Sequence, residues 1–393
     1  MISTGSKNFM RWQSVAGMLI ILAAVLALIA ANTGLQPWFD MAREPFLGIS
    51  LGSATVSKPL LLWINQAGMT VVLFVVGLEC KRAVLDGELK GPDRLRLPVV
   101  AALGGMMASV AVFAGLGGVD QAWDSRWVIP LGMDMALGLA ALSWLGERVP
   151  GALKVFWTTM SMFSFIGSVS LLAGLQAGLL AWPELALAGA CLAVLLLMNL
   201  VRVEAISLYL FPATVLWAAV AGSAAHAALA GLVSAFFIPA TNREQNRSPL
   251  LELEQDLLPL VCCAVLPLLA LANAGLSLSD AGSALMEPGV LGIMLGLFPA
   301  KALGIFILCW LGVWMKVCAL PAGLGWKEVC GTALLGGAGF TVNSFLGVVL
   351  VNGVGMGEAG LAIMVATTIS VLSGFFFLRL VLARRRNKVL QRS

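Results

Sequence analysis

The stretch Ile129-Pro130-Leu131-Gly132-Met133-Asp134 places a proline, a glycine and an acid within six residues of one apolar segment. A second stretch, GGAGFTVN at residues 336–343, places three glycines within another apolar segment. Proline removes a helical hydrogen bond and clashes with the preceding turn, and glycine lowers helix propensity. Both segments are therefore predicted to be broken helices.

The composition around these two stretches is that of a membrane protein. Of the 393 residues, 60% are hydrophobic and only 11% are charged, whereas a soluble domain has roughly 25% charged residues. Many apolar runs approach the ~20 residues that a helix needs to cross a bilayer. We expect an all-α polytopic membrane protein that forms a single unit over residues 1–393. Its twelve predicted spans are 15–33, 60–80, 97–117, 122–144, 151–175, 183–201, 206–220, 222–238, 257–275, 289–311, 328–350 and 358–382.

Positive charges predict the orientation of these spans. When loops are assigned alternately to the two sides, one side collects most lysines and arginines. The other side carries only Arg43, Lys58 and Arg126. The positive-inside rule places both termini in the cytoplasm, so that residues 34–59 form a periplasmic loop and residues 383–393 a basic cytoplasmic tail. The basic run 384–386 is expected to face anionic lipid, and no nucleic acid is expected as a partner.

Short motifs along nearly the whole chain, taken in order and spacing, resemble those of the NhaA-type bacterial sodium/proton antiporters. Each motif alone is weak, but together they are highly specific. They are Leu61 to Asn65, Gly77-Leu78-Glu79 with Lys81-Arg82, Ile129 to Asp134, Arg148-Val149-Pro150 with Ala152-Leu153-Lys154, His226-Ala227 with Leu229-Ala230-Gly231, Phe236 to Pro239, Leu271 to Gly275, Lys301 with Leu303-Gly304-Ile305, and Gly339-Phe340-Thr341.

The resemblance implies an inverted-repeat antiporter fold in which the fourth and eleventh helices are broken and cross. In that family an acid at the position of Asp134 balances helix N-termini, and a lysine at the position of Lys301 balances helix C-termini. Such partners are needed because each helix end carries about half an elementary charge. The resemblance also implies a short hairpin that supports a homodimer, and the alternating residues between Gly48 and Lys58 fit it.

The chain departs from the family at the ion site. The family's two adjacent aspartates in the fifth span correspond to Ser164 and Phe165, and its threonine before the fourth-span acid corresponds to Met133. A buried carboxylate suits cation/proton exchange because desolvation raises its pKa towards the working pH. Neither serine nor phenylalanine can titrate in that way. The candidates that remain for transport are Asp134, Ser161, Ser164, Lys301, Thr341 and Asn343, with sodium expected at Asp134 and Ser164.

Two further expectations concern charged groups. Without the paired aspartates, Asp134 and Lys301 are each the only oppositely charged mid-membrane residue that the sequence offers to the other, and we predict that they form a pair. The resemblance also links Glu79, His226 and Glu254 to a response to pH.

Two functions stay open at this point. The first is exchange of sodium or lithium for protons by alternating access in the bacterial inner membrane, which would serve pH and sodium homeostasis. The second is a family-derived membrane protein without this exchange, either inactive, regulatory or carrying another solute. The expected partners are sodium or lithium ions, protons, the lipid bilayer and a second copy of the chain. No cofactor is expected, and the sequence offers no catalytic triad, phosphate loop or metal-ligand cluster typical of an enzyme.

Overall fold

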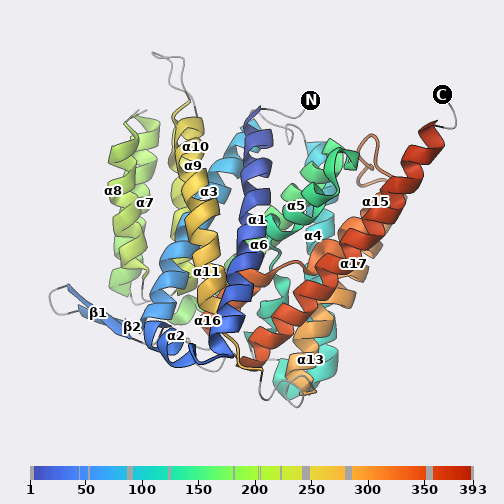
Figure 1. Cartoon of the computed structure of the whole chain (residues 1–393). Helices are drawn as coiled ribbons and strands as arrows, with labels where there is room; N and C mark the ends of the chain where they lie inside the picture. The colour runs from blue at the N-terminus through green and yellow to red at the C-terminus, as the bar shows by residue number, and fades with distance from the viewer. Residues whose placement is uncertain are drawn as a thin grey trace.

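A computed structural model shows a bundle of helices that run mostly along one direction (Figure 1). It describes residues 4–43, 45–51, 54–85, 92–122, 125–179, 182–201, 203, 205–221, 224–240, 248–278, 286–350 and 357–390. Ten helical segments in this part of the chain are long and apolar enough to cross a membrane, and two shorter apolar helices, Ile206–Ala219 and His226–Phe237, accompany them. The all-α polytopic membrane architecture expected from the sequence is confirmed.

The helices have the following bounds. The uninterrupted ones are α1 (Thr4–Ala31), α3 (Leu60–Leu85), α4 (Pro92–Ala122), α6 (Gly151–Leu175), α7 (Trp182–Leu200), α8 (Ile206–Ala219), α9 (Ala224–Phe237) and α17 (Gly357–Leu390). The interrupted ones are η1 (Ser125–Leu131) with α5 (Met135–Trp144), α10 (Pro249–Leu260) with η4 (Val261–Val265) and α11 (Leu266–Asn273), α13 (Pro288–Leu295) with η5 (Gly296–Ala300) and α14 (Lys301–Trp314), and α15 (Trp326–Leu334) with η6 (Leu335–Gly337) and α16 (Phe340–Leu350). Two single turns, η2 (Gly146–Arg148) and η3 (Ala177–Leu179), lie next to α6.

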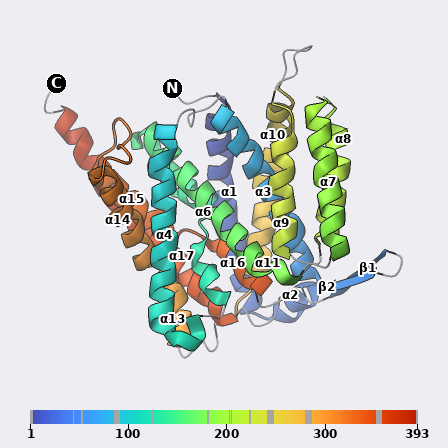
Figure 2. The same cartoon turned by 180° about the vertical axis from the view of Figure 1, so that it is seen from behind.

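One end of the bundle carries a helix and a hairpin that follow α1. Helix α2 (Gln36–Arg43) leads to strands β1 (Phe46–Leu51) and β2 (Ala54–Pro59), which pair antiparallel from Phe46 opposite Pro59 to Leu51 opposite Ala54. These strands lie where the sequence analysis expected a hairpin, and residues 44, 52 and 53 of the expected periplasmic loop lie outside the described residues. The hairpin extends away from the bundle on the side of α7 and α8 (Figures 1 and 2).

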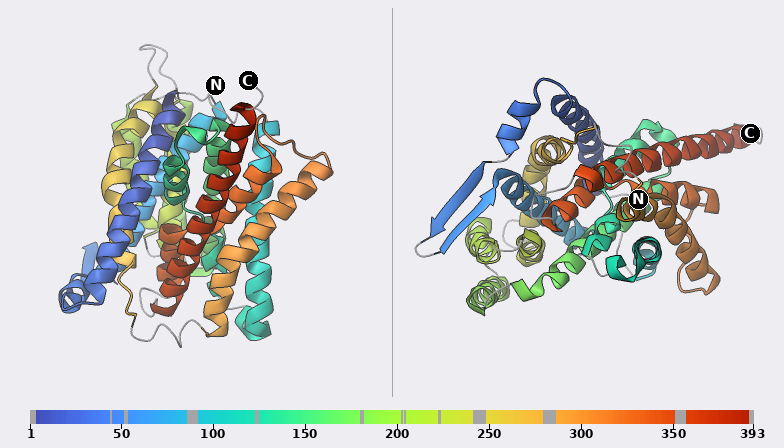
Figure 3. Two further views of the ribbon diagram at one scale, coloured as in Figure 1. Left: turned by 45° about the vertical axis from the view of Figure 1, so that its right-hand side comes forward. Right: turned by 90° about the horizontal axis from the view of Figure 1, so that it is seen from below.

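Both ends of the described chain, Thr4 of α1 and Leu390 of α17, lie at the other end of the bundle (Figures 1 and 3). Helix α17 continues to Leu390, beyond the predicted end of the last span at residue 382. Most of the expected basic tail therefore prolongs this helix, and residues 391–393 lie outside the described part. Helix α1 likewise begins at Thr4, earlier than the predicted residue 15.

Small residues let the helix backbones approach closely. A Cβ atom on Gly104 of α4 would collide with the carbonyl of Gly304 on α14, and a Cβ atom on Gly304 would collide with that of Gly104. Gly231 of α9 approaches the carbonyl of Thr70 on α3 in the same way. Close packing through glycine is characteristic of helix pairs in membranes, where no hydrophobic force drives helices together.

Two of the long helices contain a π-helical turn. The turn Gly296–Ala300 contains Pro299, which has no N–H to give to the regular helical ladder. Such a turn changes the direction in which the following side chains point, and π turns are frequent at functional sites. This one directly precedes Lys301.

Candidate functional site

The first break lies between η1 and α5. The 3-10 helix ends at Leu131, and α5 begins at Met135 after a non-helical link. Asp134 has extended backbone angles, φ −96° and ψ 109°, and its side chain accepts a hydrogen bond from the N–H of Ala136. Asp134 is thus the N-cap of α5, a position that favours aspartate because its carboxylate satisfies a free helical N–H.

The second break lies between η6 and α16, and it meets the first. Ala338 is extended, with φ −66° and ψ 98°, and its carbonyl accepts a hydrogen bond of 2.6 Å from the N–H of Asp134. Close contact is possible because a Cβ atom on Gly132 would strike Val342 and Asn343, and one on Gly339 would approach the carbonyl of Gly132. The two interruptions read from the sequence are therefore present and lie side by side.

The Asp134 carboxylate faces the N-terminal ends of two helices. One oxygen accepts from Ala136 N–H at 3.1 Å, and the other accepts from both the N–H and the hydroxyl of Thr341, near the start of α16. The side chain is 3% exposed. A negative group is favourable at this place because helix N-termini carry partial positive charge.

The Lys301 ammonium group faces a helix C-terminus. Its Nζ donates to the carbonyls of Pro130 at 2.9 Å, Leu131 at 2.9 Å and Gly132 at 2.5 Å, at and just after the end of η1. The side chain is fully buried, and its stem packs against Gly105 of α4, where an added Cβ would lie 3.1 Å from the lysine Cγ. All three ammonium protons are used.

The predicted pairing of Asp134 with Lys301 is wrong. Each group is bound instead to backbone atoms of opposite polarity, N–H and hydroxyl donors for the acid and carbonyl acceptors for the lysine. The pairing was inferred from the charged residues alone, among which the backbone dipoles at the breaks do not appear. The two residues match the separate helix-end positions that the family resemblance implies.

Neither position of the missing aspartate pair offers a carboxylate. Ser164 of α6 is fully buried, and its hydroxyl donates to the Leu131 carbonyl at 2.7 Å, the same carbonyl that Lys301 contacts. Phe165 is 4% exposed and Met133 is 1% exposed, so that both are packed apolar side chains. The Ser161 hydroxyl donates within its own helix, to the carbonyls of Trp157 and Thr158.

Asn343 lies between the two breaks with its amide group unused. Its side chain is fully buried, and neither the amide nitrogen nor the amide oxygen has a hydrogen-bond partner within the described chain. An unpaired buried polar group is costly. Among the transport candidates, Asp134, Ser164, Lys301, Thr341 and Asn343 are thus gathered around the breaks, whereas the hydroxyl proton of Ser161 is spent on its own helix.

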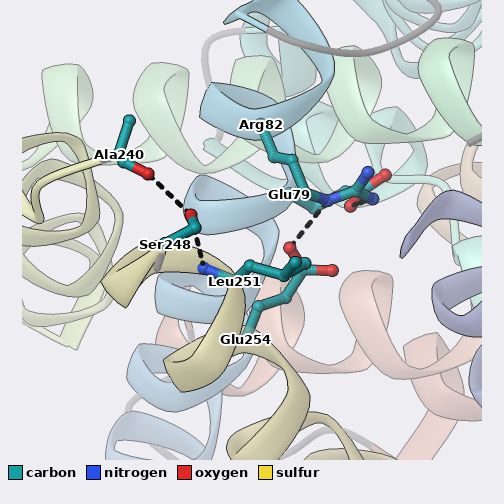
Figure 4. A network of polar contacts seen from close by, with 6 residues as sticks. All are labelled: Glu79, Arg82, Ala240, Ser248, Leu251 and Glu254. Carbon is teal, nitrogen blue, oxygen red and sulfur yellow. Dashed lines mark hydrogen bonds and ion pairs between the residues drawn. The ribbon is translucent and has the colours of Figure 1, made fainter. Parts of the chain in front are cut away.

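Two of the three residues linked to a pH response belong to one buried charge cluster, shown in Figure 4. The Arg82 guanidinium binds the carboxylates of Glu79, three residues earlier on α3, and of Glu254 on α10, the latter at 2.8 Å. Ser248 fixes the start of α10, because its hydroxyl accepts from Leu251 N–H at 3.3 Å and donates to the Ala240 carbonyl at 2.6 Å. Arg82 was not among the sequence candidates, although its spacing from Glu79 is that of a helical ion pair.

His226 is separated from this cluster. It is the third residue of α9, whereas Lys81, next to Arg82, donates to the carbonyls of Phe236 and Ile238 at the other end of α9. Ten helical residues between His226 and Phe236 span about 15 Å. The structure therefore does not bring the three pH-response candidates together.

Lys58 in the hairpin is a half-buried cation outside the spans. Its ammonium donates to the Gln66 side chain at 3.2 Å and to the Ala221 carbonyl at 2.5 Å, which ties β2 to α3 and to the end of α8. Burial lowers the pKa of Lys58 below its ordinary value.

Comparison with known proteins agrees with this geometry. The family model described as Na+/H+ antiporter 1 matches residues 7–378. The Na(+)/H(+) antiporter NhaA 1 of Pseudomonas putida strain KT2440 is 39% identical over 341 residues, 86% of each chain. The Na(+)/H(+) antiporter NhaA of Psychrobacter cryohalolentis is 38% identical over 379 residues, which cover 96% of this chain and 95% of the relative. That of Yersinia pseudotuberculosis strain IP 31758 is 37% identical over 387 residues, 98% of each chain. With two broken helices that meet at Asp134 and a match over almost its full length, this chain belongs to the Na+/H+ antiporter 1 family.

Proposed function

We propose that the protein exchanges sodium or lithium for protons across the bacterial inner membrane by alternating access. The observation that carries the proposal is the meeting of two broken helices whose ends are balanced by Asp134 and Lys301. Broken helices of this kind form ion sites in secondary transporters. Irregular backbone at that depth is tolerated only where protein or a water-filled cavity satisfies it.

The orientation belongs to the same proposal. Both ends of the described chain lie at one end of the bundle, opposite the hairpin (Figure 1). The excess of lysine and arginine on the loops of the terminal side supports a cytoplasmic location for both termini. Labelling of single cysteines introduced near residue 36 and near residue 390, in intact cells and in everted vesicles, tests this orientation.

The substituted ion site bears on the exchange ratio. Around the breaks, Asp134 is the one carboxylate among the transport candidates, and Ser164, Thr341 and Asn343 contribute neutral oxygen atoms. One carboxylate can exchange one proton for one monovalent cation. We therefore propose a one-for-one, electroneutral exchange with the breaks as the moving part.

Proton movement in everted membrane vesicles tests the function. Sodium or lithium added to energised vesicles should dissipate the proton gradient when the natural chain is present. Vesicles that lack the protein should keep the gradient. Collapsing the membrane potential with valinomycin and potassium should leave the rate unchanged. If neither cation moves protons, the protein is a family member without this exchange, and its role is regulatory or directed to another solute.

We also propose that two copies associate through the hairpin. The strand β1 starts with Phe46 and Leu47, which are 71% and 49% exposed, and an unpaired strand edge favours pairing with another chain. The mass of the detergent-solubilised protein, measured with and without residues 46–59, tests this proposal. A mass unchanged by the deletion would refute it.

A further inference from the structure

A small cavity lies where α1, α3 and α6 meet, away from the two breaks. It has a volume of about 10 Å³ and is lined by Met10, Glu79, Ala83, Val155, Thr158, Thr159 and Met162. This volume is close to the least that holds one water molecule. A single small ion or water therefore fits, and a larger solute does not.

The Thr158 hydroxyl at this cavity has no hydrogen-bond partner among the described residues. Thr158 is 6% exposed, and its Oγ1 makes no hydrogen bond within the described chain. Threonines on helices commonly donate to the carbonyl one turn earlier, as Thr332 does with Glu328 in this protein. Thr158 instead leaves a buried oxygen atom at a cavity that Glu79 also lines.

Among the described residues, the charge cluster beside the cavity has two carboxylates and one positive charge. Arg82 is the cation that both Glu79 and Glu254 bind, so that these three side chains together carry a net charge of −1 when both acids are ionised. The side chains that α1 and α6 contribute to the cavity, Met10, Val155, Thr158, Thr159 and Met162, do not titrate. On the other flank, Gly5 of α1 packs its backbone against the Arg82 guanidinium. A buried excess charge is costly unless a counterion or a proton neutralises it.

We propose that the Glu79 carboxylate and the Thr158 hydroxyl form a binding site for one small monovalent cation, sodium or lithium, which competes there with a proton. Both ligands supply oxygen atoms, the donors that hard cations take. The cation replaces the missing positive charge of the cluster, and a proton on Glu79 does the same, so that only one of them is bound at a time. Glu79 thus holds either a cation or a proton at a second place, in addition to the Asp134 carboxylate at the breaks.

Helix α6 connects this site with the breaks. Thr158, Ser161 and Ser164 follow one another at intervals of three residues, so that each is a neighbour of the next on the helix surface. From Thr158 to Ser164 the helix rises about 9 Å, and the Ser164 hydroxyl ends at the Leu131 carbonyl of the first break. A cation at Glu79 is therefore one short row of hydroxyl groups away from the moving part.

The test is cation binding by the purified full chain in detergent, because binding can be measured whether or not the protein transports. Binding of radioactive sodium and thermal stabilisation by sodium or lithium chloride are compared with choline chloride at equal ionic strength. We expect saturable binding of one sodium ion by the natural chain. Glu79→Gln should abolish it, and Thr158→Val, which removes one oxygen ligand at nearly constant volume, should weaken it about tenfold.

Ser234→Ala is the matched control. Ser234 of α9 also has a buried hydroxyl without a partner in the described chain, but it lines a separate cavity of about 320 Å³ next to α3 and α8. Its removal should leave sodium affinity unchanged. If Glu79→Gln does not fold, the proposed site is tested by the sodium affinity of Thr158→Val and by the pH dependence of sodium binding to the natural chain. Lowering the pH should weaken sodium binding by up to about tenfold per unit, because one proton competes with one cation.

Three results would overturn the inference: equal affinity in the natural chain and Thr158→Val, equal loss in Ser234→Ala, or binding that ignores pH. The inference rests on the proposed function for the identity of the ion, yet the two can fail separately. Transport that survives in Glu79→Gln with an unchanged KM for sodium would refute this site and leave the exchange intact. Pronounced binding without any proton movement would support the site and refute the exchange.

Discussion

Replacing Lys301 by methionine tests how the two breaks are held together. The change keeps the length of the side chain but removes the donor for the carbonyls of Pro130 and Gly132, while Leu131 keeps the Ser164 hydroxyl. An unsatisfied buried carbonyl costs about 1 to 3 kcal/mol, so the two together cost about 2 to 6 kcal/mol. Burying the ammonium itself is expensive. We therefore expect a net loss in the lower half of that range, about 2 to 4 kcal/mol.

The free energy of unfolding, measured by denaturant titration in mixed micelles, gives this loss directly. Lys327→Met is the control, because Lys327 is exposed near the start of α15 and its replacement should change stability by less than about 0.5 kcal/mol. Asp134→Asn, alone and combined with Lys301→Met, completes a double-mutant cycle. Because each residue binds its own helix ends, the losses should add to within about 1 kcal/mol.

Two results would refute this reasoning. A double variant that is more stable than Lys301→Met alone would mean that Asp134 and Lys301 stabilise one another as a pair. A loss in Lys301→Met no larger than in Lys327→Met would mean that the three carbonyls do not depend on the ammonium group. Either result would require a different explanation of how the breaks persist in the membrane.

Three further predictions concern the ion site, the acid and the hairpin. Restoring the pair, Ser164→Asp with Phe165→Asp, should create or strengthen sodium-dependent proton movement in everted vesicles, and no gain in a folded variant would show that the change of function lies beyond these two positions. Thr341→Val should lower the free energy of unfolding by about 1.5 to 3 kcal/mol, because the Asp134 carboxylate loses a hydroxyl donor; an unchanged value would contradict that contact. Because the pKa of Lys58 is lowered in the folded protein, the unfolded chain keeps this proton to higher pH. The free energy of unfolding should therefore rise with pH between the lowered pKa and 10.5. If a Lys58→Gln variant shows the same pH dependence of stability, Lys58 is not its cause.

The sequence alone was enough to predict the class of the fold and the places where it is irregular. Sixty per cent hydrophobic residues cannot be accommodated in a soluble domain of this length. Proline and glycine close together between Ile129 and Asp134 disfavour a continuous helix, whereas a single proline such as Pro98 does not end α4. The structure has both breaks where the sequence predicts them. The ordered motifs predicted the family, which the match over residues 7–378 confirms.

Only the tertiary structure decided which groups the charged side chains contact. Asp134 and Lys301 were expected to bind one another, but they bind backbone N–H and carbonyl groups from segments up to 207 residues away in the chain. Arg82 connects Glu79 with Glu254, which lies 172 residues after Arg82, and no local pattern predicts that contact. The unpartnered hydroxyl of Thr158 is visible only once α1, α3 and α6 are packed together.

The physical reason is the range of the interactions. Helix breaks and membrane spans depend on hydrogen bonds and transfer energies within one segment, and these can be read from neighbouring residues. The partner of a buried charge depends on which dipoles and charges the folded chain brings within hydrogen-bond distance, and backbone dipoles at helix ends carry no sequence label. The local breaks were therefore fixed by the residues at 129–134 and 336–343, whereas their charge balance and the cavity at Glu79 were decided by packing.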